Sequence, residues 1–340
     1  MESIFNQYGW SVLSVQQLHQ GLINSTYSIS TSNGDYILQS VNHHIFKDPM
    51  AIDANINAIG NFLDKKAPDY QFTHLVPTQI GNTLVEWEGQ YFRAFKKING
   101  YSLTVLDNPT QAKEAASQFG KFTQILSQFD IRNLKITLPD FHNLSLRYHQ
   151  FNEALNNGNQ SRLNTSKEAI SFLQSQKKLV NTFDNFIHHA DAIQRVTHHD
   201  TKISNVLFNS ENGVEKAICV IDLDTVMPGY FISDVGDMCR TYLCKVSEEE
   251  VDLNLIQIEK ERWDFLKQGY LAQMQNSLSN FEKDHFVFAG QFMIYMQALR
   301  FITDHLNNDS YYGAKYEGQN FVRALNQIEL LKRFNESIIN

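Results

Sequence analysis

A chain of 340 residues exceeds the usual size of a single hydrophobic core, which favours two lobes with a ligand cleft between them. The formal net charge of -8, with no long run of Lys or Arg, argues against nucleic acid or an anionic membrane as the main partner. The first residues lack a secretory signal, no apolar run reaches membrane-spanning length, and three cysteines without metal-finger spacing fit reduced thiols, so we expect a cytoplasmic protein.

The first third of the chain predicts a small antiparallel sheet with one helix. Apolar and polar residues alternate on both sides of Asn33-Gly34, which is a typical hairpin turn. Two further short strands are expected over residues 83–87 and 91–95. Between the hairpins, residues 49–63 carry apolar side chains three or four positions apart, which indicates an amphipathic helix.

After about residue 100 the pattern becomes mainly helical. We therefore expect an α+β protein with an N-terminal lobe over residues 1–97 and a larger, mainly helical C-terminal lobe over residues 98–340. One strand-rich island interrupts the helical half, with strands expected over 206–208 and 217–221.

Local signals describe the helical half further. Thr110 is expected to cap a helix, the polar residues 156–165 to form a surface loop, and residues 167–187 to be helical again. Capping boxes over 247–250 and 279–282, each with Ser at the first position and Glu at the last, predict two further helix starts.

Two segments carry the residues with the most telling chemistry: His198-His199-Asp200-Thr201-Lys202-Ile203-Ser204-Asn205 and, after an apolar hairpin, Ile221-Asp222-Leu223-Asp224. A metal-dependent phosphotransferase needs a carboxylate beside the acceptor hydroxyl and hard oxygen ligands for Mg²⁺. In this pattern Asp200 would be the catalytic carboxylate, and Asn205 and Asp222 the metal ligands. On an extended segment, Asp224 would point the same way as Asp222 and face the same metal.

Other polar residues near Asp200 have more than one interpretation. The Asp-x-Lys spacing lets the ammonium of Lys202 meet the transferring phosphoryl oxygens, so we assign it a catalytic role. His198 is either a general base or, as we favour, a structural residue that braces the loop by hydrogen bonding. Asp234 and Asp237 either orient the metal loop or, as we favour, cap the next helix. The alternative to a catalytic site is an exposed polar loop between two strands.

In the N-terminal lobe, the segment Gly21-Leu22-Ile23-Asn24-Ser25-Thr26 falls at a turn between expected strands. Its backbone amides and hydroxyls could cover phosphate groups. An ordinary hairpin turn is the alternative, because the segment has a single glycine.

These segments resemble the aminoglycoside phosphotransferase and choline kinase superfamily. Its His-x-Asp-x4-Asn loop is matched from His198 to Asn205, and its following Ile-Asp by Ile221-Asp222. More narrowly, residues 200–208 and 220–229 are similar to the corresponding segments of bacterial N-acetylhexosamine 1-kinases. The similarity follows the order of the chain over nearly its whole length.

The resemblance implies a two-lobed, protein-kinase-like fold that transfers the γ-phosphoryl group of ATP to the anomeric hydroxyl of N-acetylglucosamine or N-acetylgalactosamine. Asp200 would accept or orient that hydroxyl, while Mg²⁺ on Asn205 and Asp222 neutralises phosphate charge. Arg300 and Asp304, one helical turn apart, would contact the sugar, with a buried ion pair between them as an equal alternative. The nucleotide would lie against these residues: Gly21, Asn24, Ser25, Thr26, Gln39 and Phe95.

Two departures from the superfamily affect the expected phosphate site. The strand position that usually carries a phosphate-binding lysine is Gln39, and the helix that usually offers its glutamate partner has Asp53 and Asn55. We expect Lys202, together with Lys47, to supply the missing charge. The alternatives are a kinase for another sugar, an amino alcohol or an aminoglycoside, and a nucleotide-binding pseudokinase. The sequence predicts neither the preferred epimer nor an oligomeric state.

Overall fold

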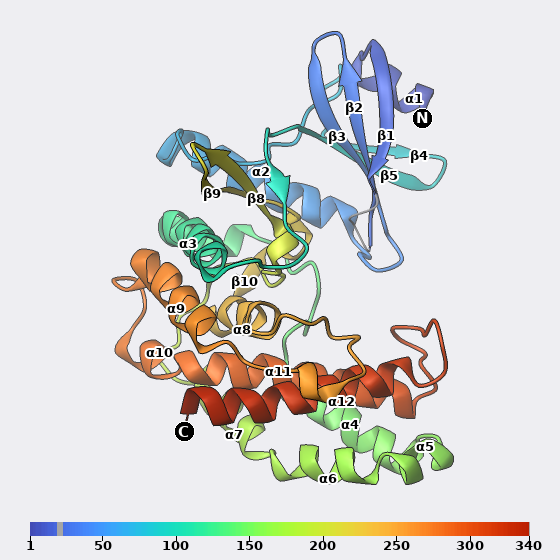
Figure 1. The fold of residues 1–340 in the computed structure, drawn as a ribbon. Coiled ribbons are helices and arrows are strands. Elements are labelled where there is room, and N and C mark those ends of the chain that lie inside the picture. The colour runs from blue at the N-terminus through green and yellow to red at the C-terminus, as the bar shows by residue number, and fades with distance from the viewer. Residues whose placement is uncertain (19–22, 340) are drawn as a thin grey trace.

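The computed structural model of the protein describes residues 1–18 and 23–339. Figure 1 shows a small part with a twisted sheet, coloured blue to cyan, above a larger and mainly helical part. The expected α+β class, with a small antiparallel-sheet lobe followed by a helical lobe, is therefore confirmed.

The N-terminal sheet has five strands in the order β1-β2-β3-β5-β4, and every neighbouring pair is antiparallel. Both expected hairpins are present, since the Asn33-Gly34 turn joins β2 to β3 and β4 pairs with β5. A strand before residue 21 was expected without bounds, and it is present as β1. The sheet ends at Lys96, and a lobe boundary after residue 97 stays a prediction. The five strands are β1 (Val12–Leu18), β2 (Ser25–Thr31), β3 (Gly34–Val41), β4 (Leu84–Trp87) and β5 (Gln90–Lys96).

One helix packs on the outer side of this sheet and another connects it to the rest of the molecule. Helix α1 (Glu2–Tyr8) buries Ile4 in a small core with Ile29 of the sheet. Helix α2 (Pro49–Lys66) confirms the expected amphipathic helix, and its buried residues belong to the larger core that continues into the C-terminal part. The side chain of Asp48 caps the start of α2 by accepting a hydrogen bond from a backbone N–H of the first turn. Helix α2 therefore anchors the small lobe on the large one.

The C-terminal part is arranged around α11. Figure 1 shows α11 and α12 side by side, with α8 and α9 above them and α4 to α7 below. Its helices are α3 (Pro109–Ile125), α4 (Leu144–Asn157), α5 (Gln160–Thr165), α6 (Lys167–Ser175), α7 (Lys178–Ile187), α8 (Phe231–Tyr242), α9 (Lys260–Met274), α10 (Asn280–Asp284), α11 (Phe286–Leu306) and α12 (Gln319–Phe334). Its short strands are β6 (Tyr101–Ser102), β7 (Arg195–Thr197), β8 (Val206–Glu211), β9 (Val214–Val220) and β10 (Met227–Gly229).

Several helix starts differ from the sequence expectation. Helix α3 is capped by the side chain of Asn108 and not by Thr110, because Pro109 already occupies the first helical position. The expected loop over 156–165 is wrong, since Asn159 caps α5 within it. The capping box over 279–282 is present, but it opens the short α10, and α11 begins separately.

The capping box expected over 247–250 is wrong as well. The backbone there forms a turn, and the next α-helix begins only at Lys260. The Ser side chain accepts a hydrogen bond from Glu249, while the side chain of Glu250 binds Asp252 instead of reaching back to the turn. A capping box requires both reciprocal bonds.

Helix α11 also corrects the expectation that no apolar run reaches membrane-spanning length. Within the described parts of the chain it alone is long and apolar enough to cross a membrane. However, 72% of the apolar window is buried inside the protein. A buried apolar helix of this kind is the core helix of the fold.

Candidate active site

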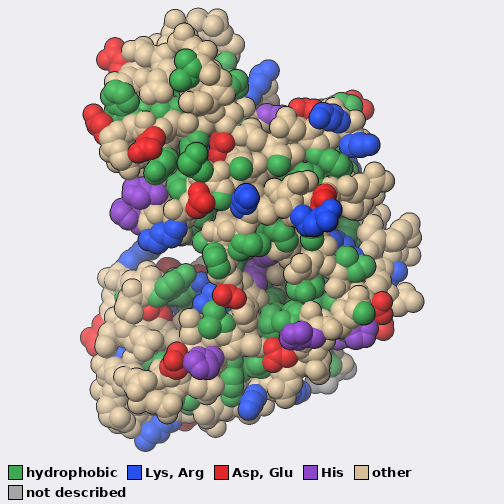
Figure 2. Space-filling view, turned by 180° about the vertical axis from the view of Figure 1, so that it is seen from behind, with side chains coloured by type: hydrophobic (Ala, Val, Ile, Leu, Met, Phe, Trp, Pro, Cys, Tyr) green, Lys and Arg blue, Asp and Glu red, His purple; other side chains and the backbone are tan. Residues whose placement is uncertain are grey.

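A cavity of about 450 Å³ lies between the sheet lobe and the helical lobe. Figure 2, seen from behind, shows the molecule hollowed between its small upper and large lower parts. This volume is within the usual range of small-molecule and cofactor sites. The predicted site residues that line the cavity come from both lobes: Asn24, Thr26, Gln39, Phe95, Asp200, Lys202, Asn205, Asp222 and Asp224.

Other predicted site residues do not line this cavity. Ser25 is exposed at the start of β2, next to two residues that do line it. Arg300 and Asp304 lie on α11, away from the cavity wall. Gly21 lies outside the described residues.

Two buried side chains, the ring of His198 and the carboxylate of Asp234, hold the loop that carries Asp200 in place. The ring of His198 donates from Nε2 to the carbonyl oxygen of Ile221 at 3.0 Å, and its Nδ1 accepts from the N–H of Asp200 at 3.3 Å. Burial lowers the pKa of His198 to about 4, despite the nearby Asp200 charge. Both ring nitrogens of the neutral His198 thus form hydrogen bonds. The side chain connects the loop that carries Asp200, here called the catalytic loop, to the segment that carries Asp222, here called the metal loop.

Asp234 fixes the same loop through its backbone. Its carboxylate accepts hydrogen bonds from the N–H groups of His198 at 3.1 Å and His199 at 2.7 Å. The expected capping role is wrong, because Asp234 lies inside the first turn of α8 and bonds across to the loop. Asp237 does not cap the helix either, since it pairs with Arg240 one turn along α8.

Asp200, Lys202 and Asn205 form one hydrogen-bonded group. The ammonium of Lys202 donates to Oδ2 of Asp200 at 2.8 Å, and Nδ2 of Asn205 donates to the same oxygen at 2.9 Å. Burial alone would raise the pKa of Asp200, but Lys202 and the hydrogen bonds hold it below its usual value. Asp200 is therefore ionised, and its other carboxylate oxygen remains available for a hydroxyl group.

Asp222 differs from the expectation of an extended segment. It adopts a left-handed backbone conformation with φ 63°, and a 3-10 turn over Leu223–Thr225 follows it. Its side chain makes no hydrogen bond to any residue that the structure describes. Burial, with repulsion from Asp224 and Asp200, raises its pKa to about 7. A non-glycine residue in this conformation is typical of functional sites.

These oxygen atoms fit a divalent cation. Because Asn205 directs its Nδ2 to Asp200, its Oδ1 is left to face another partner, and the carboxylate of Asp222 forms no ion pair with any described residue. Within the residues that the structure describes, no cluster of three or more His, Cys, Asp or Glu could hold a metal by itself. Mg²⁺ usually takes one or two protein ligands and completes its shell with phosphates and water, which agrees with Asn205 and Asp222 alone.

Asp224 is engaged elsewhere. One of its oxygens accepts a hydrogen bond and ion pair from Arg93, and the other accepts from Nδ2 of Asn24 at 2.7 Å. Both of its oxygens thus accept from the small lobe and its side chain is only 2% exposed, while its expected role as a metal ligand stays a prediction.

Sequence reasoning missed a buried cation next to the cavity, Arg93. It lies on β5, directly opposite Gln39 of β3, and both Nε and Nη2 donate to Oε1 of Gln39, at 3.1 and 2.8 Å. The expectation that Lys47 supplies charge here finds no support, since Lys47 is exposed and does not line the cavity. The available signal for this residue was a positive charge at a buried strand position. That strand neighbours the one on which the lysine is missing.

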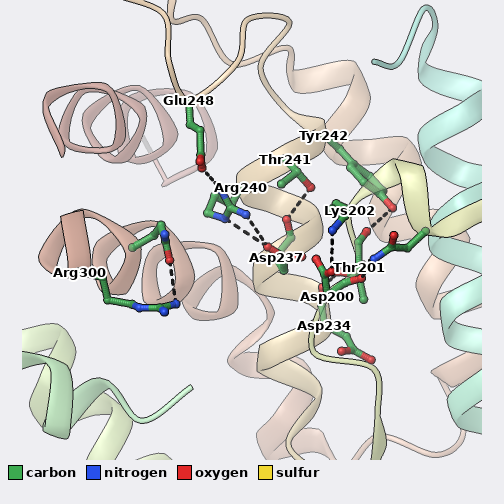
Figure 3. Close-up of polar contacts among 12 residues, drawn as sticks. Asp200, Thr201, Lys202, Asp234, Asp237, Arg240, Thr241, Tyr242, Glu248 and Arg300 are labelled. Atoms are coloured by element: carbon green, nitrogen blue, oxygen red, sulfur yellow. Dashed lines mark hydrogen bonds and ion pairs between the residues drawn. The ribbon is translucent and has the colours of Figure 1, made fainter. Parts of the chain in front are cut away.

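A group of charged side chains lies beside Asp200 (Figure 3). Arg240 donates to Asp237 at 3.0 Å and to Glu248 at 2.8 Å, and Glu248 also pairs with Arg323. Figure 3 shows Arg300 reaching from α11 toward α8. These contacts build a polar wall next to the catalytic loop.

Arg300 and Asp304 are not an ion pair. The guanidinium of Arg300 lies 5.3 Å from the ring centre of Tyr312 and 5.7 Å from that of Tyr311, and no carboxylate among the described residues pairs with it. Asp304 instead accepts hydrogen bonds from the backbone N–H groups of Tyr311 at 2.7 Å and Tyr312 at 2.9 Å, and from Asn320. Asp304 therefore orders the loop that surrounds Arg300.

Such a cleft, in which an ionised carboxylate, a lysine and oxygen ligands for a cation meet beneath an antiparallel sheet, defines a phosphotransferase of the kinase-like class. A profile of the phosphotransferase enzyme family matches residues 14–268 of the chain. The protein belongs to this family.

Solved structures with the same fold include kinases of small molecules. A microcompartment-associated aminopropanol kinase has a TM-score of 0.66 and 17% identity, covering 99% of this chain and 97% of that one. An aminoglycoside phosphotransferase from Alicyclobacillus acidocaldarius subsp. acidocaldarius DSM 446 has a TM-score of 0.64 and 12% identity, with 99% and 95% covered. A spectinomycin phosphotransferase in complex with ADP and spectinomycin has a TM-score of 0.60 and 13% identity, with 99% and 97% covered.

Proposed function

We propose that the protein is an ATP-dependent kinase that phosphorylates the anomeric hydroxyl of an N-acetylhexosamine, GlcNAc or GalNAc. One observation carries the phosphotransfer: Asp200, Asn205 and Asp222, which come from two separate segments, line a single cavity between the lobes. Membership of the phosphotransferase family supports the same chemistry. The identity of the acceptor is supported by the similarity of the catalytic and metal segments to N-acetylhexosamine 1-kinases and by the charge beside Asp200.

In the proposed reaction, Asp200 orients the anomeric hydroxyl and takes its proton. The hydroxyl oxygen forms a bond to the γ-phosphorus, the bond from that phosphorus to the bridging oxygen breaks, and ADP leaves with the electron pair. Lys202 donates to the phosphoryl oxygens as negative charge redistributes, and Asn205 and Asp222 would hold Mg²⁺, which when bound neutralises phosphate charge. Positioning and charge compensation thus supply most of the rate enhancement.

The charge around His142, which lies against His199 of the catalytic loop, favours a neutral acceptor over a cationic one. His142 has a pKa well below its usual value, first because of burial and then because of positive charges that include Arg300, Arg240 and Arg147. Neither Arg300 nor Arg147 forms an ion pair with a carboxylate in the described parts of the chain. Guanidinium groups donate to carbonyl and hydroxyl oxygens but repel ammonium groups, so an acetamido sugar fits this wall better than an aminoglycoside or an amino alcohol.

The test is incubation with ATP, Mg²⁺ and a panel that contains GlcNAc, GalNAc, glucose, ethanolamine and an aminoglycoside, followed by phosphorus NMR. We expect a product phosphate coupled to the anomeric proton of the two acetamido sugars. A phosphate on another hydroxyl, or a preference for the amines, would replace the proposed acceptor but keep the kinase. No transfer to any compound, together with nucleotide binding, would favour a pseudokinase.

A further inference from the structure

The buried cation of the small lobe, Arg93, lies behind the residues that line the cavity and does not line it itself. Arg93 is only 1% exposed and does not line the cavity, whereas its partners Gln39 and Asp224 both do. Its guanidinium grips Oε1 of Gln39 with two N–H groups and forms an ion pair with Asp224. Arg93 thus contacts one residue of each lobe at the same end of the cavity.

The two hydrogen bonds from Arg93 determine which side-chain atom of Gln39 faces the cavity. With Oε1 held by Arg93, the amide nitrogen points to the opposite side, where it donates to Oγ1 of Thr26 at 3.3 Å. An amide nitrogen carries two donor hydrogens, so a second N–H is left for a ligand. Gln39 and Thr26 therefore present hydrogen-bond donors on the wall where a phosphate-binding lysine is missing.

The grip on Asp224 connects the small lobe to the metal loop. Asn24 donates to the second oxygen of Asp224, and Oδ1 of Asn24 accepts from the backbone N–H of Asn42 at 2.9 Å. The β1–β2 connection, the end of β3 and strand β5 thus all connect to Asp224. Asp222, two residues earlier, takes its position from this anchored turn.

The helix that would offer a glutamate makes different contacts. Asp53 accepts from Thr83 at 2.8 Å and from Asn57 at 3.0 Å. Asn55, only 1% exposed, donates to the carbonyl oxygens of Lys135 and Val226. Neither residue pairs with Gln39. Helix α2 is instead fastened directly to the segment that follows the metal loop.

We propose that Arg93 is a positioning residue for the nucleotide phosphates, acting through Gln39 and Asp224. From the neighbouring strand it orients the amide of Gln39 toward the phosphates and holds the turn that presents Asp222. The planar fork of an arginine can serve both partners at once, which the single ammonium of a lysine cannot. This inference rests on the proposed use of ATP.

The test is Arg93→Lys in the full-length chain, which keeps the charge but removes the fork. We expect affinity for ADP with Mg²⁺, measured by calorimetry, to fall about tenfold, and the KM for ATP to rise in step. The KM for the acceptor should stay within about twofold. A merely structural role would lower thermal stability without this separation of the two KM values.

Arg262→Lys is the matched control. Arg262 is also 1% exposed and donates to two backbone carbonyls, but it lies on α9 and does not line the cavity. We expect this variant to lose stability while keeping nucleotide affinity. Equal weakening by both variants would overturn the role of Arg93.

Asp224→Asn provides a second route if Arg93→Lys does not fold, because it is isosteric and removes only the charge that Arg93 holds. Its affinity for ADP with Mg²⁺ should also fall, with an unchanged KM for the acceptor. A wild-type protein that transfers phosphate, together with variants of normal nucleotide affinity, would overturn this inference alone. A wild-type protein that binds no nucleotide would overturn the proposed function as well.

Discussion

The two ends of the cavity are built in different ways. The catalytic end takes Asp200, Lys202 and Asn205 from one loop of the chain, and the side chains of Lys202 and Asn205 both donate to Asp200. The phosphate end takes Arg93, Gln39 and Asp224 from three separate elements. The catalytic end is a local motif, whereas the phosphate end exists only through strand pairing and lobe contact. The difference shows why a departure at one residue, Gln39, need not remove a function.

The largest effect is expected at the local end. Asp200→Asn should lower kcat by about 10²- to 10⁴-fold, because the amide cannot take the hydroxyl proton. Affinity for ADP with Mg²⁺ should change little. Steady-state kinetics with the acceptor found by NMR, and calorimetry on the same preparation, measure both quantities. Turnover near that of the wild type would remove Asp200 from the reaction.

A smaller effect, on nucleotide affinity, is expected at Asp222, where the catalytic end and the phosphate end of the cavity meet. Asp222→Ala should weaken binding of ADP about tenfold or more in the presence of Mg²⁺, because a charged metal ligand is lost. Without Mg²⁺, the affinity should not fall, since the removed carboxylate would only repel phosphates. Calorimetry with and without the cation separates the two. An affinity that is the same in both proteins at saturating Mg²⁺ would mean that Asp222 is not the ligand.

A change in the polar wall next to the catalytic loop, where we propose that the acceptor binds, should act independently of both ends of the cavity. Arg300→Gln should raise the KM for the acceptor about tenfold and leave the KM for ATP unchanged, since a charged hydrogen bond is lost on one side only. Arg132→Gln is the control, because Arg132 has a side chain that is 87% exposed and pairs only with its neighbour Asp130. A change in the KM for ATP of the same size would contradict separate sites.

The smallest effect on catalysis is expected from the brace beneath the catalytic loop, His198, whose contribution is to stability. The folded pKa of His198 is lowered to about 4 by burial, so between about pH 6.5 and pH 4 the unfolded chain binds a proton that the folded chain does not. Stability should therefore fall as the pH drops through this window, by roughly 3 kcal/mol for this one histidine. The raised pKa of Asp234 acts in the opposite direction.

His198→Gln isolates the histidine, because the glutamine keeps a donor for Ile221 and leaves Asp234 in place. Urea unfolding of both proteins at several pH values gives the comparison. The variant should show the smaller loss of stability between pH 6.5 and pH 4. Parallel curves would mean that folding does not lower the pKa of His198.

The sequence predicted the parts of the site that lie within short segments. Two hairpins followed from turn residues, and the catalytic loop followed from the spacing between His198 and Asn205. The position of Arg93 could not be predicted in this way, because its partner Asp224 is 131 positions away and its partner Gln39 is set by strand register. The extended segment expected at Asp222 was wrong, because a left-handed residue has no marker when it is not glycine.

The helical lobe shows the same limit. One-turn spacing placed Arg300 and Asp304 on one helix, yet it could not reveal that Asp304 binds backbone N–H groups of the loop that follows the helix. Capping signals identified the real box at Ser279, but Ser247 carries the same pattern in a turn. Such choices depend on tertiary contacts, which a local pattern does not contain.

The anchoring of the loop by Asp304 has an evolutionary consequence. Its carboxylate holds the backbone around Tyr311 and Tyr312, and Asn320 joins the same anchor through Gly313. Tyr311 itself is 71% exposed, so its side chain contributes little to the core. If the acceptor binds beside Arg300 as proposed, replacement of this tyrosine would alter which compound is recognised while the buried anchor keeps the fold intact. An enzyme arranged in this way can acquire a new substrate by exchanging a few exterior side chains.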